Sequence, residues 1–257
     1  MKTYYPRQYI ELFHLLFLGQ LGRKVDKKLY AIKGGCNMRF YFNSIRYSED
    51  IDIDIQTINK NTLQKNVDQI LHSAPFNNIL QTHGMKIATI SNHKQTPTTQ
   101  RWKILLTIQG SALPLHTKIE FSRRHFGGDV KFEAINPQLL KQYSLSPIMV
   151  NHYSLQSMYE QKILALALRT ETQSRDIFDL YLLINSGEQF NSLGKETLQH
   201  IETAKANATG IHFSDFKGQV IAYLSEDDKQ EYDDKAIWKV IVKKVIQALD
   251  GHQYETD

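Results

Sequence analysis

The chain has 257 residues, a net charge of +4 and 41% hydrophobic residues, enough to bury a core in one large domain or two modest ones. Its single cysteine, Cys36, excludes an internal disulfide and favours a reducing compartment. The first residues lack a signal-peptide core, and the apolar stretch 12–18 is too short to span a bilayer. We therefore expect a cytoplasmic protein with no membrane segment. Its mildly basic charge is compatible with a nucleotide or RNA partner.

The first 130 residues mix helical and β-rich patterns. Expected helices cover residues 6–21, 35–42 and 61–71, and expected strands cover residues 29–33, 51–55, 85–90, 101–108 and 117–121. This order predicts a small mixed sheet with helices packed on it.

The pattern becomes helical beyond about residue 130. Expected helices there cover residues 155–168, 176–184, 195–206, 213–224 and 235–249. The Gly127-Gly128 pair and the Asn136-Pro137 step are the expected places for the change. We therefore predict an α+β protein with one domain at residues 1–130 and a helical domain at residues 131–257.

Acidic residues alternate with isoleucine between Asp50 and Ile55. Side chains alternate faces in a strand, so Asp50, Asp52 and Asp54 are expected on one face and the isoleucines on the other. Crowded carboxylates repel one another, and a hard divalent cation relieves that repulsion. The pattern therefore indicates a magnesium site, although an exposed acidic edge strand would need no ligand.

A glycine pair precedes this strand. Gly34-Gly35 lets backbone amides approach a phosphate closely, or lets a helix begin at one. With the acidic strand, the pair resembles the signature of DNA polymerase β-like nucleotidyltransferases. The sequences Lys33-Gly34-Gly35-Cys36-Asn37-Met38-Arg39 and Arg46-Tyr47-Ser48-Glu49-Asp50-Ile51-Asp52 are similar to the motifs of the AbiEii/AbiGii toxin family. Cys36 and Met38 depart from the threonine and leucine usual there.

Glu120 occupies a similar position on a later expected strand. The alternation in Lys118-Ile119-Glu120-Phe121 separates the carboxylate from the apolar residues, so a neighbouring strand could place it near Asp52. The superfamily resemblance implies the same role, whereas a surface glutamate is an equally open reading. Arg123, Arg124 and His125 follow as a basic cluster able to hold a phosphate.

The helical half contains a lysine among apolar residues. Lys162 lies within the apolar stripe of the expected helix 155–168, so it must find a partner or extend its stem to water. Ser174 is expected to cap the next helix, with Asp176 in the first turn. Lys162, Asp176 and Asp179 also resemble later motifs of the toxin family, which implies that they complete the active site.

The resemblance implies a magnesium-dependent nucleotidyltransferase with two metal ions and a nucleoside triphosphate substrate. The implied catalytic residues are Asp50, Asp52, Lys162, Asp176 and Asp179, and the implied metal ligands are Asp50, Asp52 and Glu120. The implied nucleotide-binding residues are Lys33, Gly34, Gly35, Arg39, Arg46 and Ser48.

The family comparison further implies a toxin that modifies the 3′ end of tRNA and has an antitoxin encoded nearby. A protein or small-molecule acceptor is an alternative, as is a non-catalytic module that binds nucleotide or RNA. The sequence gives neither the acceptor nor the nucleotide.

Overall fold

The protein forms two compact units in the computed structural model. The structure describes residues 3–123, 127–190 and 192–252. The first unit comprises residues 1–43 and 47–153, and the second comprises residues 44–46 and 154–257. A three-residue segment from the N-terminal half therefore belongs to the otherwise C-terminal unit.

The first unit is built on a seven-stranded mixed sheet with the order β3-β4-β5-β2-β1-β7-β6. The strands are β1 (Tyr30–Lys33), β2 (Ile51–Ile55), β3 (Met85–Gln95), β4 (Thr99–Ile108), β5 (Leu115–Ser122), β6 (Val130–Ala134) and β7 (Met149–Tyr153). β2 pairs in parallel with β5 and β1 pairs in parallel with β7, while the other neighbouring strands are antiparallel.

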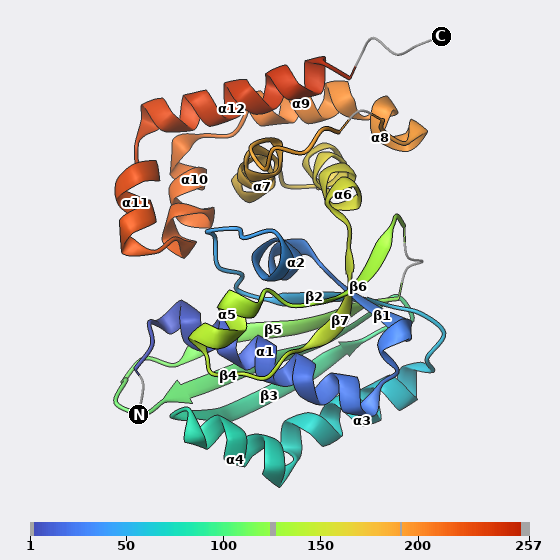
Figure 1. Ribbon diagram of the computed structural model, residues 1–257, viewed down its shortest axis with the longest axis vertical. Coiled ribbons are helices and arrows are strands. Elements are labelled where there is room, and N and C mark those ends of the chain that lie inside the picture. The colour runs from blue at the N-terminus through green and yellow to red at the C-terminus, as the bar shows by residue number, and fades with distance from the viewer. Residues whose placement is uncertain (1–2, 124–126, 191, 253–257) are drawn as a thin grey trace. The chain divides into compact units, whose positions relative to one another are not determined.

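Helices cover one face of this sheet (Figure 1). The helices of the unit are α1 (Pro6–Lys24), α2 (Gly34–Tyr41), α3 (Lys60–His72), α4 (Ala74–Thr82) and α5 (Pro137–Gln142). β4 shows the resulting alternation: Trp102 and Ile104 are buried in the core, whereas Lys103 between them is exposed. Apolar burial on one face only leaves the opposite face of β3, β4 and β5 to water.

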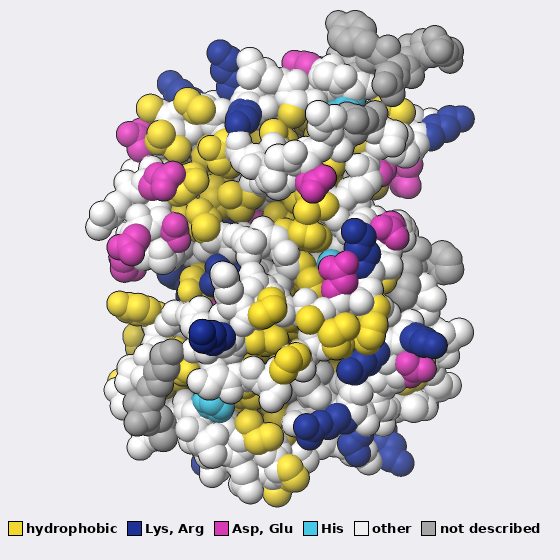
Figure 2. Space-filling model, in the orientation of Figure 1, with side chains coloured by type: hydrophobic (Ala, Val, Ile, Leu, Met, Phe, Trp, Pro, Cys, Tyr) yellow, Lys and Arg dark blue, Asp and Glu magenta, His cyan; other side chains and the backbone are white. Residues whose placement is uncertain are grey.

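The second unit is helical. Its helices are α6 (Leu155–Leu168), α7 (Ser174–Ile184), α8 (Lys195–Gln199), α9 (Ile201–Thr209), α10 (Phe213–Gln219), α11 (Glu226–Tyr232) and α12 (Lys235–Asp250). Helix α12 packs on α7 and α9, and it buries Trp238, Ile241, Val245 and Leu249. Acidic side chains gather over α11 on the face shown in Figure 2, in agreement with the three acids of its first turn.

The predicted mixed sheet and helical second half are confirmed, but the division between the compact units differs from the predicted one. The units divide after Tyr153 rather than near residue 130, because β6 and β7 extend the sheet beyond that point. The expected helix 195–206 is also broken, with α8 ending at Gln199 and α9 beginning at Ile201.

Among the described residues, no helix combines the length and apolarity that crossing a membrane requires.

Candidate active site

Three carboxylates lie on the open side of β2 and β5. Asp52 and Glu120 are paired in register across these parallel strands, so their side chains project from the same face of the sheet. Asp50 directly precedes β2, two residues from Asp52. The structure thus places the three predicted metal ligands on one side of the sheet, although within the described ranges they do not converge as a ready-made metal site.

Two of these carboxylates already contact a cation of the chain. Lys118 Nζ lies 2.8 Å from Asp50 Oδ2, and Arg101 Nε donates to Glu120 Oε2. Neither cation was predicted from the sequence as a partner of these acids. The position of Lys118 could have been predicted, because it lies two residues before Glu120 and so shares its face of β5. Arg101 is placed by pairing between β4 and β5, which the sequence does not reveal.

Asp52 lies between like charges. Burial raises the pKa of its carboxyl above the usual aspartate range, and the Asp50 and Glu120 carboxylates raise it further, while Lys118 and Lys33 oppose the change. This electrostatic environment favours either a proton or an additional cation beside Asp52.

The start of α2 lies against the same carboxylate. Gly34 has a φ of +63°, and a Cβ atom added there would lie 3.4 Å from Asp52 Oδ2. A side chain at position 34 would therefore be strained by the backbone conformation, and its Cβ would be in van der Waals contact with the carboxylate. Backbone amides in the first turn of a helix have no intrahelical partner, so Gly34 and Gly35 can present theirs to an anion.

A network of short polar contacts holds the segment that leads into β2. Ser48 Oγ donates to the Asp50 carbonyl oxygen at 2.7 Å, and Cys36 Sγ donates to the same oxygen at 3.3 Å. Thr117 Oγ1 donates to the Glu49 carbonyl at 2.8 Å and bonds His14 Nε2 at 2.7 Å. The Ser48 hydroxyl proton is therefore used to position Asp50.

Asp54, the third acid of β2, is held by two partners. It is buried, it forms an ion pair with Lys33, and Tyr153 Oη donates to it at 2.6 Å. Lys33, a predicted nucleotide contact, is engaged there. Arg39, another predicted nucleotide contact of this unit, donates to Glu11 at 2.7 Å and stacks over the ring of Tyr47.

The remaining predicted residues form a buried charge cluster in the second unit. Lys162 Nζ lies 3.0 Å from Asp176 Oδ1 and 2.6 Å from Asp179 Oδ2, which satisfies the requirement for a partner read from the sequence. Arg46 donates to both Asp179 oxygens at 3.0 to 3.2 Å. Arg169 was not predicted from the sequence. Its Nε lies 2.8 Å from Asp176 Oδ2, and the two groups form an ion pair but not a hydrogen bond.

The charges of this cluster compensate one another. Burial alone would raise the pKa of Asp179, but Arg46 and Lys162 outweigh it and hold that pKa at about 2. The predicted capping role of Ser174 was wrong. Ser174 is the first residue of α7, and its hydroxyl donates to the Asp215 carbonyl and to Gln219 instead.

The oxygen donors of Asp50, Asp52 and Glu120 have the hard chemistry that Mg²⁺ prefers, and their mutual repulsion fits a bound cation. Within the described ranges, however, no three histidine, cysteine or acidic side chains converge as a ready-made metal site. These residues therefore suit a metal chemically, and a bound substrate would have to complete its coordination.

The predicted basic cluster is only partly described, since Arg124 and His125 lie outside the described residues. Arg123 donates to Gln100 Oε1 and to the Ile58 carbonyl.

The fold is shared with solved structures, one of which is a nucleotidyltransferase toxin. MenT4, a nucleotidyltransferase toxin from Mycobacterium tuberculosis, superposes with a TM-score of 0.64 at 15% identity, covering 97% of this chain and 84% of that one. JHP933 from Helicobacter pylori superposes with a TM-score of 0.59 at 15% identity, covering 97% and 96% of the two chains. Among curated protein sequences none matches this chain significantly.

The family profile described as "Nucleotidyl transferase AbiEii toxin, Type IV TA system" matches residues 16–252. The chain belongs to this family of nucleotidyltransferase toxins of type IV toxin-antitoxin systems. It is therefore a nucleotidyltransferase, as the sequence resemblance implied.

Proposed function

We propose that the protein transfers a nucleoside monophosphate from a nucleoside triphosphate to the hydroxyl at the 3′ end of tRNA. One observation carries this proposal. Asp52 lies between Asp50 and Glu120 on the open side of the sheet, and its carboxylate lies against the glycine that begins α2. Carboxylates and free backbone amides are thus available side by side, as metal-assisted phosphoryl transfer requires.

In this proposal Asp50, Asp52 and Glu120 would hold Mg²⁺. When bound, two such ions would neutralise charge that develops on the α-phosphate and the departing pyrophosphate. Lys118 and Arg101 now contact two of these carboxylates, so a metal would have to compete with them. Weak binding of Mg²⁺ to the free protein, and tighter binding with a triphosphate present, is the expected consequence.

We further propose that the amides of Gly34 and Gly35 bind triphosphate oxygens. Among the predicted nucleotide contacts these two glycines have the strongest support. Lys33, Arg39, Arg46 and Ser48 are each engaged with another group of the protein and would have to exchange that partner for phosphate.

A catalytic role for Lys162, Asp176 and Asp179 stays a prediction. Their charged atoms contact one another, Arg46 and Arg169, and all three side chains are buried. These contacts support at least a structural role in the second unit. Substitutions that separate folding from transfer will decide whether they also act in catalysis.

The proposal implies a toxin that blocks translation and an antitoxin that opposes it. Because tRNA and nucleoside triphosphates are cytoplasmic, it also implies a cytoplasmic protein.

Incubation with each α-labelled nucleoside triphosphate, Mg²⁺ and total tRNA tests the proposal. We expect label in tRNA with the wild type and with Asp227→Asn, which changes an exposed acid of α11, but not with Asp52→Ala. Label in protein or a small molecule would favour the alternative acceptors. No label in any pool would contradict the transfer proposal.

A further inference from the structure

The open face of β3, β4 and β5 is polar and basic. Register pairs place Lys94, Arg101 and Glu120 in one row across the three strands. Ser91, Lys103 and Lys118 form the next row, and Thr89, Leu105 and His116 form a third, with Lys86 and Thr107 beyond them. Paired residues share a face, so the rows form one surface, which we call the basic sheet face.

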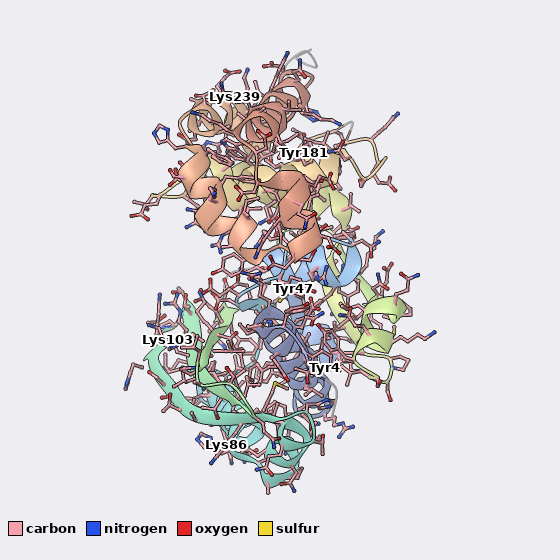
Figure 3. The ribbon with its side chains drawn as sticks, turned by 90° about the vertical axis from the view of Figure 1, so that its left-hand side faces the viewer. Tyr4, Tyr47, Lys86, Lys103, Tyr181 and Lys239 are labelled. Carbon is pink, nitrogen blue, oxygen red and sulfur yellow. The ribbon has the colours of Figure 1, made fainter. Side chains whose placement is uncertain are left out.

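This face begins at the carboxylate site, and basic side chains lie on it at increasing distance from the carboxylates. Glu120 belongs both to the first row and to the acidic site, and a hollow beside Asp50 is lined by Lys103, His116 and Lys118. Arg101 and Lys118 are paired with acids, whereas Lys86, Lys94 and Lys103 have no acidic partner among the residues the structure describes. Figure 3 labels Lys86 and Lys103 on this part of the sheet.

The side chains that share the face favour a polyanion over a protein partner. Protein interfaces are anchored by buried aromatic or aliphatic side chains, yet Leu105 is the one large apolar residue in these rows. Unpaired lysines beside threonine and serine hydroxyls instead match phosphates and ribose 2′-hydroxyls.

The residue types on the basic sheet face also favour double-stranded over single-stranded RNA. Single-stranded nucleic acid is held chiefly by aromatic side chains on which bases stack. None of the residues in the four rows is Phe, Tyr or Trp; the Trp102 ring is buried on the opposite face. A duplex needs no stacking platform, because it is recognised through its backbone and 2′-hydroxyls.

We infer that the basic sheet face binds the sugar-phosphate backbone of an RNA duplex without regard to its sequence. The inference rests on the proposed function, since a duplex held there would supply the acceptor hydroxyl near Asp50 and Asp52. The duplex portion of the acceptor is thus read by shape and charge.

Binding can be measured without chemistry, by fluorescence anisotropy of a labelled RNA hairpin with neither triphosphate nor Mg²⁺ present. The test variant is K86Q/K94Q/K103Q. The matched control is K24Q/K65Q/K141Q, which removes the same charge from exposed helix positions of the first unit. We expect the test variant to raise Kd more than tenfold and to reduce the slope of log K against log salt by about 2 to 3, roughly one per lost phosphate contact.

The control variant should bind as the wild type does, and an unstructured RNA of equal length should bind more weakly than the hairpin. The inference is overturned if the wild type does not bind the hairpin or if both variants lose affinity equally. It also fails if unstructured RNA or polyglutamate competes as well as the hairpin does.

The same variants separate this inference from the proposed function. If the test variant binds the hairpin and labels tRNA as the wild type does, the inference fails and the transfer proposal stands. If hairpin binding depends on the three lysines while the wild type labels no RNA, the inference about the basic sheet face stands and the transfer proposal fails.

Discussion

The two units use the same residue types in opposite ways. In the first unit, Asp50, Asp52 and Glu120 lie on one side of the sheet, and burial together with the two neighbouring carboxylates raises the pKa of Asp52. In the second unit, Asp179 is buried between Arg46 and Lys162, which keep its pKa at about 2. Carboxylates that repel one another are prepared to accept a ligand, whereas carboxylates that are fully paired stabilise the fold.

The largest effect that would test this contrast is on transfer activity. Asp52→Asn should lower activity by on the order of 10⁴-fold, because several kcal/mol of transition-state stabilisation depend on the carboxylate site. Its thermal stability should not fall, since neutralising a carboxylate among like charges removes repulsion. Single-turnover labelling of tRNA and thermal unfolding measure the two effects. A variant that keeps a tenth of its activity would contradict the assignment.

The second unit should respond in the opposite sense. Asp179→Asn should destabilise it by about 3 to 5 kcal/mol, because it leaves Arg46 and Lys162 buried with one carboxylate fewer. Trp102 lies in the first unit and Trp238 in the second, so urea unfolding followed by ¹⁹F NMR of 5-fluorotryptophan reports each unit separately.

Transfer per folded molecule then decides the catalytic role. If folded Asp179→Asn protein transfers nucleotide normally, this carboxylate is structural. If activity falls as far as in Asp52→Asn while the Trp238 signal stays native, the predicted catalytic role is supported and the contrast between the units breaks down.

Acidification should give a smaller effect on the second unit. The pKa of Asp179 lies below its unfolded value of 3.8, so its contribution to stability is complete above about pH 4 and is lost as pH falls through 2. The loss should approach about 2 kcal/mol. The urea midpoint reported by Trp238 from pH 5 to pH 2 measures it, and Asp179→Asn should flatten this dependence. An equal slope in that variant would rule out Asp179 as its source.

The smallest predicted effect concerns two glycines. Gly34→Ala should cost about 1 to 2 kcal/mol because Gly34 has a left-handed backbone conformation, and it should weaken triphosphate binding if the backbone shifts to relieve that strain. Gly19→Ala is the matched control. Gly19 lies within α1 with no atom near an added Cβ, so its replacement should stabilise the protein by roughly 0.5 to 1 kcal/mol. Equal effects of the two substitutions would contradict the proposed constraint at Gly34.

Local patterns in the sequence predicted much of the fold. The strand Ile51–Ile55 and the helix Leu155–Leu168 have their predicted bounds, because alternation and helical periodicity are strong in both. β6 and β7 were missed. Three of the five β6 side chains are exposed, and β7 gains its place by pairing with β1 more than one hundred residues earlier in the chain. The compact units therefore divide later in the chain than the predicted domains do.

The same limit applies to the candidate site. The shared face of Asp52 and Glu120 was foreseeable, since both strands alternate clearly. The pairing of Arg46 with Asp179 was not, because it joins residues 133 positions apart and depends on how the second unit packs. Sequence motifs therefore predicted residues that the structure places in two clusters, but they could not show which carboxylates lie half-buried on the sheet and which are fully buried in the helical unit.

Arg46 also makes the folding of the second unit depend on a residue that is translated within the first. It belongs to the second unit although its neighbours in sequence, Asn43 and Tyr47, belong to the first. At typical translation speeds, a ribosome would add Asp179 roughly 7 to 27 seconds after Arg46. A nascent chain must therefore keep this guanidinium available until α7 emerges. A fragment starting at Ser154 would keep Lys162 but lack Arg46, so we expect it to be less stable than the same helices in the full chain.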